Sequence, residues 1–208
     1  MKVERDIVSI DYDRVDASKY LREHPCNCPI RVLEHTLIHR TLREGVSHNV
    51  AFLTIEVGGV EYHVAEVEGE WPFQAMDLAF RNVLSRAQGA VRIRSVESCA
   101  YDLTARRDRS GSPAGMHGKA HVKIAWCVVF DNENHLMDMT KASPVALVRA
   151  QRHHECKREH WNTDAFGADS IQATARALVD GYNYYLTSIL TRPGVVPVDS
   201  PAAVLVPA

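Results

Sequence analysis

Alternation of apolar and polar residues predicts β-strands in several segments of the chain. The clearest is 119–130, in which every second residue is apolar and faces one side. The segment 50–67 also alternates, on both sides of Gly58-Gly59, a pair typical of a tight hairpin turn. Shorter segments predict three further strands, at 7–13, at 91–104 (one strand, or two joined at a bulge) and at 161–166.

Apolar residues recur at helical spacing in two other segments, 72–87 and 169–190. Pro72 suits the first turn of the first helix, and the carboxylate of Asp169 suits the N-cap of the second. Gly181 costs about 1 kcal/mol inside a helix, which indicates close packing against a neighbouring element. The two apolar stripes are Met76, Phe80, Val83, Leu84 and Ala87, and Ile171, Ala175, Leu178, Tyr182, Tyr185, Leu186 and Ile189.

The order of these elements repeats, because three strands followed by a helix occur twice. The order predicts an α+β fold, a single domain over 1–190 built of two β-β-β-α units, 1–90 and 91–190. We interpret this as a repeat of structure and not of amino-acid sequence. The remaining segments are helical and loop insertions at 14–47 (with a helix over 29–45), 105–118 and 131–160, and an extended or disordered tail at 191–208.

Composition and charge exclude several classes of protein. The formal net charge of −2 gives no overall basic field for nucleic acid, and no apolar run approaches the roughly 18 residues of a membrane span. The charged, alternating start of the chain is unlike a signal peptide. Five irregularly spaced cysteines are unlike a secreted disulfide framework. We therefore expect a cytoplasmic protein with reduced thiols and neither nucleic-acid nor membrane partners.

Three stretches resemble one family. EGEWPFQAMDLAFRNVL is similar to the segment that opens the first helix of the C-terminal allosteric, or dimerisation, domain of isopropylmalate and citramalate synthases. VESCAYDLTARR resembles the strand that opens the second unit of that domain, and WNTDAFGADSIQATARALVDGYNYYL resembles its second helix. The resemblance implies two β-β-β-α units of that allosteric-domain type, a homodimer, and an amino acid or related acid as effector.

The chain also departs from the family. Glu70 and Trp71 stand where the family has small residues. The family's catalytic (β/α)₈ barrel needs about 250 residues, so we expect that this chain is not a complete synthase by itself. The first hypothesis is therefore a dimeric regulatory-type protein of amino-acid biosynthesis that binds an amino acid or a 2-oxo or 2-hydroxy acid and acts with a separate synthase catalytic subunit. The alternative is an enzyme of a specialised biosynthetic pathway, with the effector pocket converted to an active site.

The two predicted helix starts are the candidate ligand site. A helix N-terminus presents unpaired N–H groups and partial positive charge, which suit a carboxylate or phosphate. A plain structural interpretation is that Pro72 and Asp169 only begin and cap helices. By the resemblance, the ligand-binding residues are Gly69, Glu70, Trp71, Pro72, Gly167, Ala168, Asp169 and Ser170.

Two groups of histidines and cysteines are further candidates. Cys26, Cys28, His35 and His39 offer two thiolates and two imidazoles for zinc, although Cys-x-Cys is tighter than the usual spacing. The alternative is partly buried cysteines beside the predicted helix. A second group has a thiol and imidazoles for nucleophilic or proton-transfer chemistry, but a solvated linker explains it equally. These weak catalytic candidates are His153, His154, Cys156 and His160.

Overall fold

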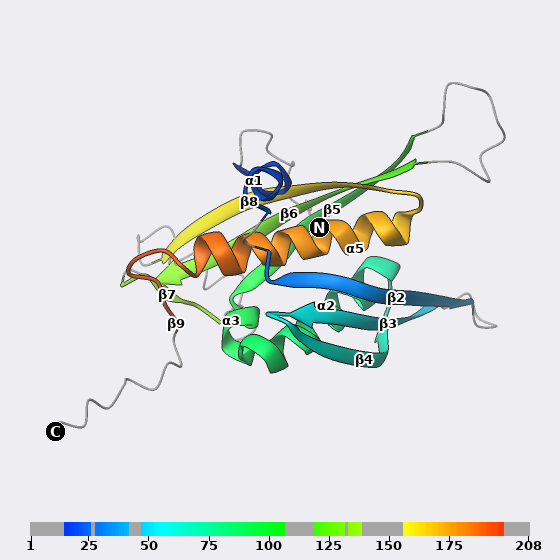
Figure 1. The fold of residues 1–208 in the computed structure, drawn as a ribbon, viewed down its shortest axis with the longest axis horizontal. Coiled ribbons are helices and arrows are strands. Elements are labelled where there is room, and N and C mark those ends of the chain that lie inside the picture. Colours follow the sequence, from blue (N-terminus) through cyan, green and yellow to red (C-terminus); the bar gives the residue numbers. More distant parts are fainter. Residues whose placement is uncertain are drawn as a thin grey trace, which may run out of the picture.

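A computed structural model describes residues 15–25, 28–41, 47–106, 119–131, 133–138 and 156–197, and it has an α+β fold (Figure 1). Unit one consists of β2 (Ile30–Thr41), β3 (Ser47–Val57), β4 (Val60–Gly69) and α2 (Pro72–Gln88). Unit two consists of β5 (Val96–Arg106), β6 (Lys119–Asp131), β8 (Cys156–Gly167) and α5 (Ser170–Tyr184). The shorter elements are β1 (Val15–Asp16), α1 (Ala17–Glu23), α3 (Ala90–Arg94), β7 (His135–Leu136), η2 (Tyr185–Ile189) and β9 (Val196–Pro197).

The two units pair their strands in the same way. In unit one β3 lies between β2 and β4, and in unit two β6 lies between β5 and β8, with every pair antiparallel. In unit two, β1 adds to β8 in parallel, and β7 pairs with β6. The predicted hairpin turn is confirmed, because Gly58 and Gly59 both have positive φ. The predicted bulge lies between Ser98 and Ala100 in β5.

The predicted helix over 29–45 is wrong, because Ile30–Thr41 is the strand β2. β2 pairs with β3 along its whole length, from Ile30 opposite Val57 to Thr41 opposite Ser47. Residues four apart share a face in a strand as well as in a helix, so the spacing of the apolar residues fits both. β2 is therefore the first strand of unit one and not part of an insertion, and the strand predicted at 7–13 lies outside the described residues.

The start of the strand predicted at 91–104 is also wrong, because Ala90–Arg94 forms the short helix α3 and β5 begins at Val96. The helix predicted over 169–190 is confirmed as α5, and its last turn widens into the π-helix η2. The described helices include none with both the length and the apolar character to cross a bilayer.

Helix α5 holds the two units together. It lies between the sheet of unit two and strand β2 of unit one (Figure 1). Toward the sheet, Gly181 lies so close to Trp126 that a Cβ atom would be 2.1 Å from the indole ring, which confirms the close packing expected at this glycine. Toward β2, the side chain of Asn183 accepts from the N–H of Ile30 at 2.9 Å and donates to its carbonyl oxygen at 3.1 Å.

A buried polar contact joins α2 to α5. The hydroxyl of Tyr182 donates to Asp77 at 2.7 Å, and Asp77 also accepts from the guanidinium of Arg81 at 2.8 Å. Arg81 in turn donates to the carbonyl oxygens of Ile93 and Val96, at 3.2 and 2.8 Å. The contact therefore fixes α2 against α5 and against the connection into β5.

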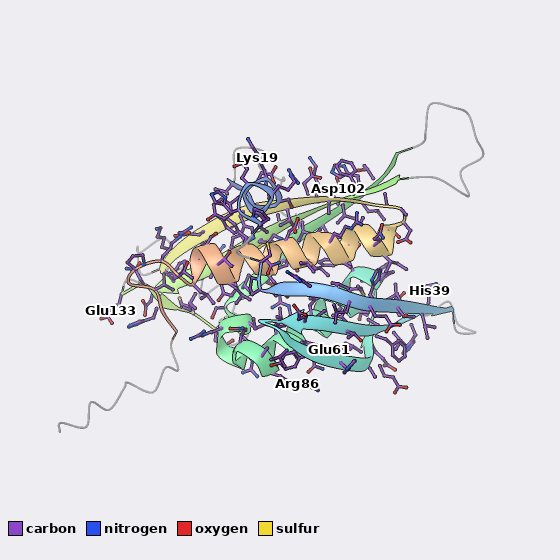
Figure 2. The ribbon with its side chains drawn as sticks, viewed as in Figure 1. Lys19, His39, Glu61, Arg86, Asp102 and Glu133 are labelled. Carbon is purple, nitrogen blue, oxygen red and sulfur yellow. The ribbon has the colours of Figure 1, made fainter. Side chains whose placement is uncertain are left out.

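Charged side chains of both signs are exposed over α1, β4, α2, β5 and the turn after β6. Figure 2 labels one on each, and all of them are exposed: Lys19, Glu61, Arg86, Asp102 and Glu133.

Candidate functional site

A cavity of about 380 Å³ lies between the first turns of α2 and α5. This volume falls within the roughly 300–1,000 Å³ typical of small-molecule sites. Most of its lining is apolar, with a few side chains that can form hydrogen bonds. The lining residues are Leu37, Trp71, Pro72, Phe73, Gln74, Met76, Tyr101, Leu103, Ser170, Ile171 and Thr174.

The two turns that lead into these helices have the same construction. The N–H of Glu70 donates to the side chain of Gln74 at 2.8 Å, and the N–H of Ala168 donates to that of Gln172, also at 2.8 Å. These contacts depend on a short sequence repeat, in which a glycine is followed by glutamine five residues later and by alanine six residues later. The sequence interpretation missed this repeat.

The glycine of each turn allows a close approach of the backbone. A Cβ atom at Gly69 would lie 2.5 Å from the nitrogen of Ala75, and one at Gly167 would lie 2.4 Å from the nitrogen of Ala173. Real Cβ atoms do not come that close to backbone atoms. The glycines therefore shape the two turns, although they do not line the cavity.

The two helix starts differ in their capping. Asp169 caps α5, because its carboxylate accepts from the N–H of Gln172 at 2.7 Å. Trp71 occupies the same position in α2 but forms no capping hydrogen bond, and its side chain is 69% exposed. The first turn of α2 therefore keeps backbone N–H groups, and the partial positive charge of a helix start, that the side chain of Trp71 does not cap.

Tyr101 connects the floor of the cavity to both helices. Its ring stacks on Phe73 with 4.4 Å between the centroids, and its hydroxyl is 3.0 Å from that of Thr174. Thr174 donates to the carbonyl oxygen of Ser170 at 2.7 Å. Burial raises the pKa of Tyr101 above its ordinary value, so at neutral pH this residue is a neutral hydroxyl.

Of the eight residues predicted to bind a ligand, the structure places three in the cavity lining: Trp71, Pro72 and Ser170. Gly69 and Gly167 shape the turns. Glu70, Ala168 and Asp169 are exposed in those turns and do not line the cavity.

The sequence interpretation missed most of the apolar lining. Phe73 and Met76 belong to the first turns of α2, and Ile171 and Thr174 occupy the matching positions of α5. The missed signal is the apolar second residue of each helix, Phe73 and Ile171, which lies four residues after the glycine of the turn. Leu37, Tyr101 and Leu103 come from β2 and β5.

The structure does not bring together Cys28, His35 and His39, the three described residues of the predicted zinc site. His35 and His39 lie on a strand that rises about 3.3 Å per residue, so Ile30 and His39 are roughly 30 Å apart along it. Cys28 lies two residues before Ile30, and it therefore cannot share an ion with His39. Cys26 lies outside the described residues. His39 instead forms a hydrogen bond with Asn49 at 2.8 Å.

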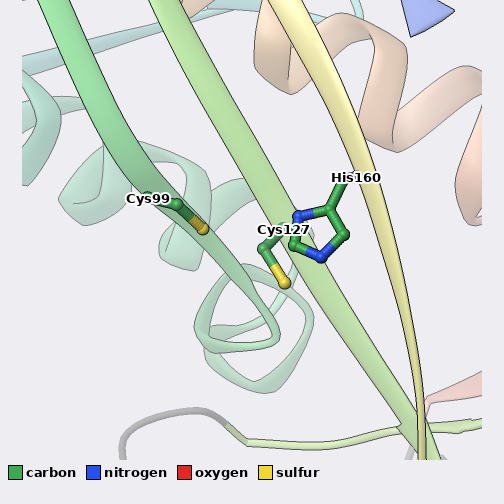
Figure 3. Close-up of side chains that lie close together, drawn as sticks. All are labelled: Cys99, Cys127 and His160. Atoms are coloured by element: carbon green, nitrogen blue, oxygen red, sulfur yellow. The ribbon is translucent and has the colours of Figure 1, made fainter. Parts of the chain in front are cut away.

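Cys156 and His160, the two catalytic candidates that the structure describes, do not line the cavity. His153 and His154 are outside the described residues, and Cys156 is buried beside Cys127 and Val129. Trp126 faces α5, and successive residues of a strand face opposite sides. Cys127 of β6 and His160 of β8 are directly opposite each other in the strand register, so both lie on the face of the sheet that is turned away from α5. Cys99 lies close to them (Figure 3). A hydrogen bond with Cys99, together with burial, raises the pKa of the Cys127 thiol.

No protein-family model fits this chain, and no curated protein sequence is significantly similar to it.

Proposed function

We propose that this chain is a regulatory-type protein that binds a small acid with an apolar side chain, such as an amino acid or a 2-oxo or 2-hydroxy acid, between α2 and α5. The observation that carries the proposal is a cavity of ligand size at two matched helix starts. The apolar lining suits the side chain of the ligand, and the uncapped first turn of α2 suits its carboxylate.

Trp71 supports the proposal further. A large aromatic side chain that is 69% exposed beside an apolar cavity contributes little to the core and offers a flat wall to a ligand. The other two tryptophans, Trp126 and Trp161, are fully buried. Trp71 therefore reports separately on this site, because a soluble quencher reaches it and does not reach the buried pair.

The first experiment is a thermal-unfolding screen against amino acids, 2-oxo acids and 2-hydroxy acids. A ligand that binds only the folded chain raises the melting temperature by linkage. The same ligand should protect Trp71 from acrylamide quenching. Trp71→Ala should remove the ligand-induced rise in melting temperature and leave the unliganded melting temperature nearly unchanged.

A matched control is Leu78→Ala. Leu78 lies on the same helix, is 40% exposed and does not line the cavity, so ligand binding should survive the substitution. Severe destabilisation by Trp71→Ala would make Trp71 a packing residue. Unchanged ligand binding in that variant would place the ligand elsewhere.

The proposal includes a homodimer, and an action on a separate synthase catalytic subunit. Both rest on the resemblance to the isopropylmalate and citramalate synthase allosteric domain. Sedimentation at micromolar concentration tests the dimer, and a monomer at all concentrations would contradict it.

The alternative, an enzyme with a converted pocket, loses its main support among the described residues. The cavity lining offers hydroxyls and one amide, from Tyr101, Ser170, Thr174 and Gln74, whereas Cys156 and His160 lie on the far face of the unit-two sheet. We therefore favour ligand binding.

A further inference from the structure

Cys99, Cys127 and His160 come from three adjacent strands and meet on one face of the unit-two sheet (Figure 3). Cys127 of β6 is directly opposite His160 of β8. Cys99 belongs to the bulge of β5, between Ser98 and Ala100. The two sulfur atoms and an imidazole nitrogen all lie within 4.8 Å of one another. Residues that are 28 and 33 positions apart along the chain are thus brought together by the strand register and by the bulge of β5.

We propose that Cys99, Cys127 and His160 form a binding site for a thiophilic divalent cation, Zn²⁺ in the first instance. Two thiolates and one imidazole are a donor set that suits Zn²⁺. Mg²⁺ and Ca²⁺ prefer carboxylate and carbonyl oxygens instead. Three protein ligands leave a fourth tetrahedral position for water or an exogenous ligand.

The separation of the donor atoms fits this proposal. Zn–S and Zn–N bonds of about 2.3 and 2.1 Å in tetrahedral geometry place ligand atoms roughly 3.6–3.8 Å apart. The observed limit of 4.8 Å therefore requires a contraction of about 1 Å at most, which small side-chain rotations supply. By contrast, Cys28 and His39 of the zinc site predicted from the sequence lie near opposite ends of β2, and they could share an ion only if that strand folded back on itself.

The surroundings also suit a bound ion. Cys127 is 3% exposed and belongs to a small apolar cluster with Val129, Cys156 and Met137. Such surroundings strengthen the electrostatic attraction between the ion and its thiolates. Cys99 is exposed, so the ion has a path in from solvent. Binding balances as Zn²⁺ plus two thiols and a neutral imidazole giving the three-ligand complex and two released protons, so affinity should increase with pH.

The test is a titration of the reduced, chelator-treated full-length chain with Zn²⁺ in competition with a chromophoric chelator. We expect one bound ion per chain, and with Co²⁺ as probe a thiolate-to-metal charge-transfer band. Cys99→Ala and His160→Gln should each weaken Zn²⁺ binding by about 100-fold or more, because loss of a direct ligand should exceed the roughly 10–100-fold effects of outer-shell changes. Cys99 is exposed and His160 partly exposed, so both variants should fold, and thermal unfolding without metal verifies this.

Two matched controls complete the experiment. Cys156→Ala removes a buried thiol of the same face outside the trio, and Cys28→Ala removes a thiol of the zinc site predicted from the sequence. Both should keep the affinity and the charge-transfer band. The proposal is overturned if Cys99→Ala binds Zn²⁺ as tightly as the unmodified chain, if only Cys28→Ala loses it, or if neither ion binds the reduced chain.

Discussion

The two β-β-β-α units share their topology but differ in how they bury their sheets. In unit one, β3 buries only its inner face, with Ala51, Leu53, Ile55 and Val57, and β4 is largely exposed. In unit two, β6 is buried on both faces. Trp126 and Val128 face α5, whereas Ala125, Cys127 and Val129 are buried on the opposite side. The same order of elements therefore gives one half-exposed sheet and, in unit two, a central strand that is buried on both faces from Ile124 to Phe130.

The two helices differ at matched positions, counted from Gly69 and Gly167. Eight residues on, α2 has Asp77 and α5 has Ala175; fourteen residues on, α2 has Val83 and α5 has Gly181. The turn and the first helical residues are repeated, but the later positions are adapted to different neighbours. A repeated local structure thus sets where the cavity forms, and the unmatched residues determine how each unit is held in place.

The largest effect is expected at the ion pair that only α2 contains. Asp77→Ala leaves the largely buried guanidinium of Arg81 without its carboxylate, and it also removes the acceptor of Tyr182. Breaking such a buried pair should cost about 3–5 kcal/mol of unfolding free energy, which urea denaturation measures. The double variant Asp77→Ala/Arg81→Leu should recover part of the loss. A loss below about 1 kcal/mol for the single variant would mean that the pair is not structural.

The next effect is expected at the close contact that only α5 contains. Gly181→Ala places a methyl group against the ring of Trp126, which is fully buried and close to Trp161 and Tyr182. Overpacking should cost roughly 1–3 kcal/mol, despite a gain of about 1 kcal/mol in helix propensity. Trp126→Phe made in the Gly181→Ala background should cost less than Trp126→Phe alone, and a strictly additive double-mutant cycle would argue against the clash.

A smaller effect distinguishes the two helix starts. Asp169→Ala removes a cap and should cost about 1 kcal/mol, whereas Trp71→Ala should change stability by less than about 0.5 kcal/mol. Trp71→Asp should even stabilise α2, because the new carboxylate can accept from the N–H of Gln74 as Asp169 does from that of Gln172. Thermal unfolding of the three variants measures the order. Equal losses of stability in Asp169→Ala and Trp71→Ala would contradict the interpretation that Asp169 caps its helix and Trp71 does not.

The smallest effect concerns Asp180, which lies at the position matched by Asn82 in α2. Burial raises the pKa of Asp180 above its ordinary value. The folded state therefore disfavours the charged form, and stability is lost as pH rises through the raised pKa. Asp180→Asn should match the unmodified chain in acid and melt at a higher temperature near neutral pH. A difference in melting temperature that does not change with pH would contradict this account.

The sequence predicted the strands and helices whose periodicity excludes other structures. Alternation over twelve residues around Trp126 fits a strand and not a helix, and the Gly58-Gly59 turn joins two such strands. The prediction from periodicity failed at β2. There Leu33 and Leu37, or His35 and His39, are four residues apart, a spacing that fits the period of a strand and that of a helix. That ambiguity is resolved by pairing with β3, which the local sequence does not encode.

The site was predictable in part for the same reason. The turns around Gly69 and Gly167 are local, and Pro72, Trp71 and Ser170 follow them directly in the chain. Tyr101 and Leu37 were not predictable as lining residues, because strands from both units bring them to the cavity. The meeting of Cys99 with Cys127 and His160 depends on a bulge and on the register of three strands.

The sequence by itself determined the α+β class, the two helices that follow matched glycine turns, and the tryptophan at the start of α2, because each depends on residues within a few positions of one another. Only the tertiary structure decided that β2 is a strand, that Asp77 of α2 accepts from Tyr182 of α5, and that two cysteines and a histidine share one face. These outcomes depend on contacts between distant segments, whose free energy overrides weak local preferences.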